Sequence, residues 1–194
     1  RMHRALDDVD TSKVDVHVRW HPYQLDPSAP TYPNSEDKMQ MYAKKFGAAR
    51  INMMIPGVVA AGKEEGLDIK FGGKVGNTLL AHKLLHYVAE KYGYEAQNKA
   101  VHGLFKVYFE DNEDITDLEV VVKGISVTGV ATAEELRAAA TDKDLDTSVS
   151  SHISHATVPN VLEKTIVPSS SGIPPHHVTF LISPRRSRPP FAPP

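Results

Sequence analysis

The sequence predicts an α/β protein, and three runs of residues carry that prediction. From Val14 to Trp20 apolar and charged or polar residues alternate, which is the period of two expected of a strand with one buried face. From Asn77 to Tyr92 apolar residues recur every three or four positions, so we expect a core helix that is buried on two sides. His177 to Ile182 is a further short run of strand-forming residues.

Composition excludes several classes of function. The chain has 194 residues, of which 41% are hydrophobic, and this is enough for a core. No run approaches the roughly 18 apolar residues of a membrane helix, and a net charge of -2 disfavours nucleic acid as a partner. There is no cysteine, which excludes disulfides, thiolate nucleophiles and cysteine metal sites. Because Arg1 precedes Met2 and no signal segment follows, we expect missing upstream sequence and a cytoplasmic protein, with no prediction of oligomeric state.

Turn-forming residues divide the first half of the chain. Four prolines predict an extended loop from Pro22 to Pro33. We expect Ser35 to cap a helix that Gly47 ends, and a second helix to reach Gly62 with a kink or break at Pro56. After this helix we expect an extended segment from Leu67 to Phe71. The glycines that follow it, Gly72, Gly73 and Gly76, match no phosphate-binding fingerprint, so we expect a mobile connector there.

Further helices are expected after Gly93. A helix from Glu95 to Phe109 should pack antiparallel to the one before it, and shorter helices should follow at 117–126 and 132–140. Thr132 and Glu135 have the spacing of a capping box. From Thr141 onward serine, histidine and proline replace the helical periodicity, which predicts irregular structure and short strand pieces at 158–162 and 165–167 around a turn.

Histidines supply the candidate polar sites. Thr78, His82, His86 and Glu90 form the one polar ridge of the core helix that could face a cleft, although a solvated surface is the simpler interpretation. Asn77 fits a helix cap. For His152 and His155 we favour an irregular polar loop over a metal site, because no carboxylate stands at matching spacing.

Four runs in order carry a family resemblance: VRWHPYQLDP from Val18, GKEEGLDIKF from Gly62, NTLLAHKLLHYVAEKYG from Asn77 and HGLFKVYFEDNEDITDLEVVV from His102. They resemble the DsbA-like thioredoxin-fold family, and its FrnE-like branch in particular. The 2-hydroxychromene-2-carboxylate isomerases and kappa-class glutathione transferases are related to that family. The likeness extends over about 2–130.

The resemblance implies a thioredoxin-like fold with a large all-α insertion, incomplete at the N-terminus and irregular at the C-terminus. The first half of the thioredoxin-like part would be residues 1–34, the insertion 35–141, the second half 142–182 and a disordered Pro/Arg tail 183–194. The family's first strand and its Cys-x-x-Cys are missing. Its cis-proline would correspond to Pro159, preceded by Val158, with Pro174 (after Ile173) or Pro175 as a poorer fit.

Three functions follow from the resemblance. The first is membership of the thiol-disulfide oxidoreductases in a form that is inactive in exchange, since this polypeptide has no thiolate. The second is a glutathione-dependent isomerase or transferase, and the third a redox-silent binding protein or structural relic. The implied partner is a protein or small thiol, with glutathione as a ligand only under the second function. We expect no catalytic residue and no metal; the implied substrate-binding residues are Trp20, Asn77, His82, Val158 and Pro159.

Overall fold

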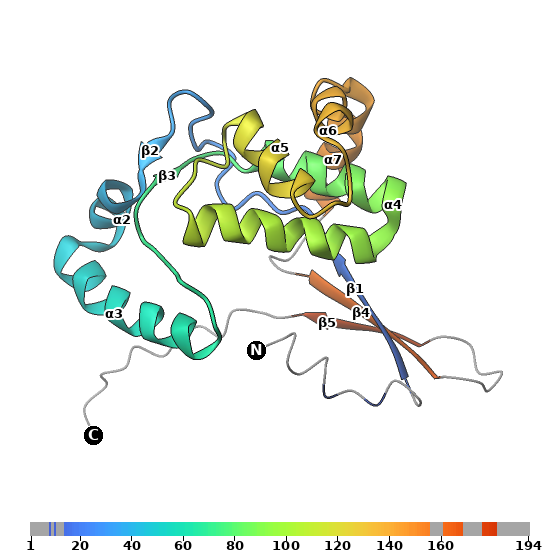
Figure 1. The fold of residues 1–194 in the computed structure, drawn as a ribbon, viewed down its shortest axis with the longest axis horizontal. Coiled ribbons are helices and arrows are strands. Elements are labelled where there is room, and N and C mark those ends of the chain that lie inside the picture. The colour runs from blue at the N-terminus through green and yellow to red at the C-terminus, as the bar shows by residue number, and fades with distance from the viewer. Residues whose placement is uncertain (1–7, 9, 11–13, 156–160, 169–175, 182–194) are drawn as a thin grey trace.

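The structure is a computed structural model that describes residues 8, 10, 14–155, 161–168 and 176–181. The Val158-Pro159 pair and the tail 183–194 lie outside the described residues. Chain segments far apart in sequence form a small sheet beside a larger helical part (Figure 1).

Three antiparallel strands form the main sheet, in the order β1-β4-β5. They are β1 (Val14–Trp20), β4 (Val161–Pro168) and β5 (His176–Leu181). The strands expected near residues 14–20 and 177–182 are therefore confirmed. The two strand pieces expected at 158–162 and 165–167 form one continuous strand over 161–168, because β4 pairs with β1 along its whole length, from Val14 opposite Pro168 to Trp20 opposite Leu162.

Helix α4 (Leu79–Phe105) provides the centre of the helical part. Gly93 interrupts it with φ 82° and ψ 174°, and the ribbon reverses direction there (Figure 1). Residues from both halves line one pocket, with His86 and Gln97 near the reversal and His82 and Phe105 farther from it. The predicted antiparallel helix pair is thus present, although its second half changes at Lys106 into the π-helix η1 (Lys106–Glu110).

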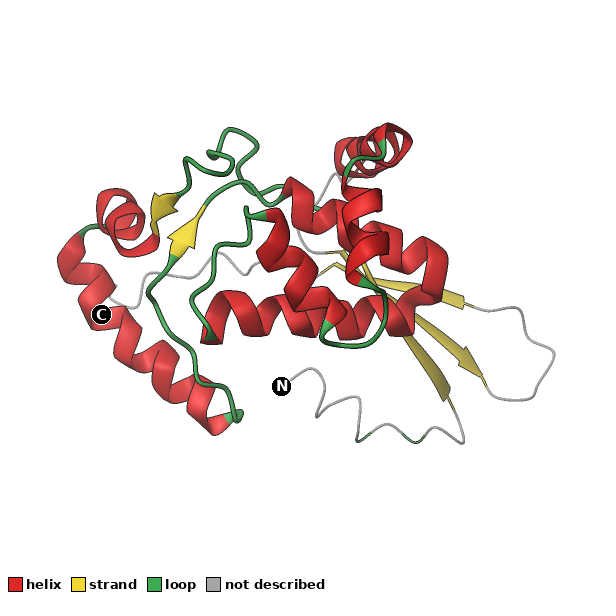
Figure 2. Cartoon of the chain, turned by 45° about the horizontal axis from the view of Figure 1, so that its top comes forward, coloured by secondary structure: helices red, strands yellow, loops and turns green. Residues whose placement is uncertain are grey.

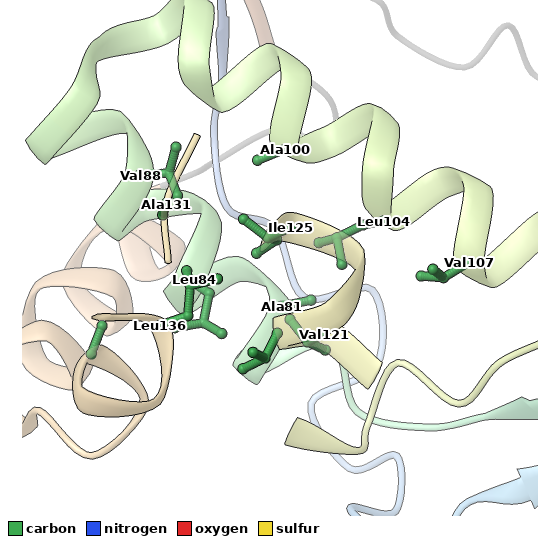
Figure 3. Packing of buried hydrophobic residues seen from close by; sticks show 12 residues of the cluster. Ala81, Leu84, Val88, Ala100, Leu104, Val107, Val121, Ile125, Ala131 and Leu136 are labelled. Atoms are coloured by element: carbon green, nitrogen blue, oxygen red, sulfur yellow. The ribbon is translucent and has the colours of Figure 1, made fainter. Parts of the chain in front are cut away.

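The core lies between the two halves of α4 and the helices that follow. These are α5 (Leu118–Ser126), α6 (Ala133–Ala140) and α7 (Lys143–His155). Figure 3 shows α5 facing both halves of α4. Buried apolar side chains there exclude water over a continuous cluster, which is the main stabilising term of such a fold; its members include Ala81, Leu84, Val88, Ala100, Leu104, Val121, Ile125 and Leu136.

Helix caps decide where α6 and α7 begin. The predicted capping box is present, since the Thr132 side chain accepts from the Glu135 N–H while the Glu135 carboxylate accepts from the Thr132 N–H. The prediction of irregular structure after Thr141 is wrong. The Asp142 side chain accepts a hydrogen bond from the Asp144 N–H at 2.9 Å, and helix α7 begins there. His152 and His155 therefore belong to a helix and not to a polar loop.

The segment from 35 to 64 departs from expectation at two points. Asp37, not Ser35, caps α2 (Lys38–Phe46), because the Asp37 carboxylate accepts from the Gln40 N–H at 2.8 Å. Ser35 donates instead to Asp114. Helix α3 (Ala48–Glu64) continues through Pro56, so the break considered there is absent.

Gly73 and Gly76 are packed against the backbone of distant residues, so the prediction of a mobile connector is wrong. The short strands β2 (Glu36–Asp37) and β3 (Lys74–Val75) pair with each other beside Gly73. Gly73 has φ 78°, and a Cβ there would lie 2.2 Å from the Asn112 carbonyl oxygen. A Cβ on Gly76 would lie 2.4 Å from the Pro30 carbonyl oxygen. Close approach of two backbones therefore explains both glycines.

Candidate functional site

A pocket opens where the end of β1 and the following loop meet both halves of α4. Its volume is about 330 Å³. Most of its lining residues are apolar or aromatic, and the others are three histidines and one glutamine, as in many small-ligand sites. The lining residues are Trp20, His21, Pro22, Tyr23, Leu25, His82, Leu85, His86, Gln97, Val101 and Phe105.

Trp20 is fixed in the wall of this pocket by α4. Its backbone N–H donates to Gln97 Oε1 at 3.0 Å, and Gln97 Nε2 donates to the Trp20 carbonyl at 2.8 Å. The indole Nε1 donates to Asn98 Oδ1 at 3.0 Å, and the ring meets Phe105 edge to face with centroids 6.0 Å apart. Four contacts therefore join the last residue of the strand to one helix face, so the aromatic wall is rigid.

His82 is half-buried and also lines the pocket. Burial lowers the pKa of His82 below 6.5, while a hydrogen bond with the Tyr23 backbone acts in the opposite direction. The ring is therefore neutral near pH 7, and a neutral imidazole offers one donor and one acceptor. The solvated-surface interpretation is wrong for this residue, although Glu90 at the end of the same ridge is exposed.

His86 connects the pocket to α7. It is buried, its Nε2 forms a 3.0 Å hydrogen bond with Ser148 Oγ, and its ring centroid lies 4.8 Å from that of His152. Burial lowers the pKa of His86, the nearby His152 lowers it further, and Glu90 opposes both. Lys83 holds the same two helices together, since its Nζ lies 2.5 Å from Asp146 Oδ1.

Asn77 has a structural position and is not among the pocket's lining residues. Its Oδ1 accepts from the Leu79 N–H at 2.9 Å, as expected of a residue at the start of a helix, and from Gln24 Nε2 at 2.6 Å. Its Nδ2 donates to the Pro27 carbonyl at 3.1 Å. These bonds fix the proline-rich loop to the start of α4, which positions Pro22 and Leu25 at the pocket.

The structure thus brings together two of the residues implied by the family resemblance, Trp20 and His82. Sequence reasoning placed His86 on the polar ridge that could face a cleft, but it assigned no site role to Leu85, Gln97 or Phe105. The spacing of four between His82 and His86 was a usable signal for His86. No local signal marks Gln97 or Phe105, because their place depends on the reversal at Gly93.

Among the helices of the described residues, none combines the length and the apolar content that spanning a bilayer requires. Within the same part of the chain, no three side chains of His, Asp or Glu gather closely enough to hold a metal ion.

The small sheet, the helical part between β1 and β4 and the pocket at the end of β1 define a thioredoxin fold with a helical insertion. The family model described as "DSBA-like thioredoxin domain" matches residues 1–160. The chain belongs to the DSBA-like thioredoxin domain family. A search of curated protein sequences finds no match to this chain.

Proposed function

We propose that this member of the family binds its substrate without covalent chemistry, in the pocket at the end of β1. The supporting observation is a mostly apolar cavity of about 330 Å³ that His82 and His86 also line, in a polypeptide that has no cysteine. Thiol-disulfide exchange requires a thiolate that attacks a sulfur atom. This polypeptide has none, so it is inactive in exchange by itself.

The ligand that fits the pocket has an apolar body and one polar group. Leu85, Val101 and Phe105 offer apolar contact, while His82 can donate or accept one hydrogen bond. An apolar side chain of an extended protein segment, together with its backbone amide, meets both requirements. Val158 and Pro159 remain proposed as the substrate-facing loop, and the FrnE-like branch as the nearest part of the family.

Trp20 provides the assay, because it is the single tryptophan of the chain and lines the pocket. Titration with an unstructured, cysteine-free peptide should change its fluorescence to saturation. Leu85→Phe places a ring in the pocket and should weaken binding about tenfold. Val127→Phe, at a residue that is 76% exposed, is the matched control and should bind as the unmodified chain does. Equal binding by both variants would place the peptide elsewhere and contradict the proposal.

Insulin reduction separates binding from exchange. The unmodified chain should show no turnover above the buffer background, since no sulfur nucleophile is present. Turnover above that background would refute the redox-silent function.

A second candidate function is chemistry on a bound small thiol such as glutathione. The observation that favours it is the position of two imidazoles with lowered pKa, His82 and His86, in one pocket. A neutral imidazole can accept a hydrogen bond from the thiol and take its proton as the sulfur attacks a second substrate. Calorimetry should then show glutathione binding, and this binding should weaken in His82→Gln. The exposed His102→Gln on the same helix is the control. Binding of S-methylglutathione as tightly as glutathione would indicate that the thiol is not recognised.

A further inference from the structure

Helix α3 presents an uncharged face to solvent. Residues 51–62 have no charged side chain, and Ile51 and Gly62 are the buried residues of the helix. Met53 is 80% exposed and Met54 45% exposed, values that are unusual for large apolar side chains on a helix of this length. Figures 1 and 2 both place α3 at the edge of the molecule, apart from the helices of the core.

The two ends of this face have opposite charge. Arg50, Gly57 and Glu64 follow one another at intervals of seven residues, so they lie on one stripe of the helix, with Met53 and Ala60 between them. Lys63 lies about 120° around the helix from Gly57. A Cβ on Gly57 would meet no atom within 4 Å, which leaves the middle of the stripe open to close approach by another backbone.

We propose that α3 is the contact surface of a symmetric dimer, in which α3 of a second copy packs antiparallel and the two helices cross at Gly57. A two-fold axis at Gly57 places Arg50 of one copy opposite Glu64 of the partner subunit, twice in the same interface. The same arrangement buries both copies of Met53 and opposes the two helix dipoles favourably. A parallel pair would place Arg50 against its own copy, so the charges select the antiparallel arrangement.

The size of this contact sets the expected affinity. Specific stable interfaces bury roughly 1,200–2,000 Å² in total, and one helix from each copy supplies less than that. We therefore expect a dimer that dissociates at micromolar concentrations, on the order of 10 to 100 μM. The pocket at the end of β1 is formed within one copy, so the dimer does not depend on the proposed function.

Sedimentation velocity over a concentration series tests the proposal with the complete chain. Arg50→Glu and Glu64→Arg each replace two attractive pairs by two repulsive ones and should raise the dimer dissociation constant about tenfold. The double variant restores opposite charges across the axis and should return the constant to within about threefold of the original. Lys99→Glu changes an exposed charge on α4 and should leave it unchanged.

The apolar part of the face is tested separately by Met53→Glu, which should abolish the dimer while the circular dichroism spectrum stays that of the unmodified chain. The exposure of Met53 makes its replacement compatible with folding. A chain that stays monomeric up to about 1 mM overturns the proposal. A dimer that survives Met53→Glu overturns it as well, and so does a double charge variant that stays as weak as the single ones.

Discussion

The side chain of Gln97 satisfies both backbone polar groups of Trp20: Oε1 accepts from the Trp20 N–H at 3.0 Å and Nε2 donates to its carbonyl at 2.8 Å. A glutamine on a helix thus takes the place that a neighbouring strand residue takes along a sheet. Gln97 is buried, so the bonds form away from water, where an unsatisfied group is costly. These two hydrogen bonds join the end of β1 to α4, and both residues line the pocket.

Gln97→Ala should destabilise the chain by about 1–3 kcal/mol, because it leaves the backbone N–H and carbonyl of Trp20 without these partners. Urea denaturation followed by Trp20 fluorescence measures the change in the free energy of unfolding. Asn98→Ala removes only the bond to the indole and should cost about 0.5–1.5 kcal/mol. An equal cost for both variants would show that the backbone bonds add nothing.

Asp146→Asn should destabilise the chain by about 1–2 kcal/mol. The Lys83 side chain is 5% exposed, and the substitution leaves its ammonium group with the Ala140 carbonyl, 2.8 Å away, and a neutral amide. Asp146 is 54% exposed, so solvent screening keeps the effect below that of a fully buried pair.

The control for that substitution is Glu119→Gln, which breaks an ion pair of 2.7 Å with Arg137 on the surface. Its urea midpoint should stay within experimental error of the unmodified chain, because both partners are at least half exposed. A loss at Glu119 as large as that at Asp146 would rule out burial as the cause.

Stability should fall as the pH is lowered from about 7 to 5. Burial holds the pKa of His82 and His86 below 6.5 in the folded chain, whereas both rise to about 6.5 on unfolding. Below that pH the unfolded chain binds more protons than the folded chain, so the free energy of unfolding decreases as the pH falls through the folded pKa values.

Urea melts at several pH values measure this dependence. In the double variant His82→Gln/His86→Gln the free energy of unfolding should change less over the same range, since two of the responsible groups are gone. His102→Gln, on the exposed side of the same helix, should keep the original dependence. If the free energy of unfolding of the double variant changed with pH as much as that of the unmodified chain, the acid sensitivity would belong to other groups.

Gly103→Ala should destabilise the chain by at least about 2 kcal/mol, although alanine favours helices. A Cβ at Gly103 would lie 2.1 Å from the Gly124 carbonyl oxygen, where α4 and α5 cross. Gly57→Ala is the matched control, because it is also within a helix and its Cβ would meet no atom within 4 Å. Measured at a concentration where the chain is monomeric, Gly57→Ala should stabilise by up to about 1 kcal/mol. If both substitutions changed the free energy of unfolding in the same direction, the close crossing of α4 and α5 at Gly103 would be contradicted.

Local sequence pattern was sufficient to predict those elements whose structure depends mainly on their own residues. The alternation in β1, the reversal at Gly93 and the capping box of Thr132 and Glu135 are each decided within a few neighbouring positions. Helix α7 was missed because its apolar residues are sparse, yet Leu145, Val149 and Ile153 follow at intervals of four, and Val149 is fully buried. Its low apolar content concealed the periodicity.

The sequence by itself determined the family, the mixture of helices and strands and the lack of a thiolate, because these depend on residue identity and short-range order. Only the tertiary structure decided that His82 and His86 face a pocket and that Gln97 holds Trp20. It also decided that Gly73 and Gly76 are packed against distant backbone. The physical reason is that each of these contacts joins residues on separate elements, so side-chain burial and pairing there follow from packing and have no local pattern.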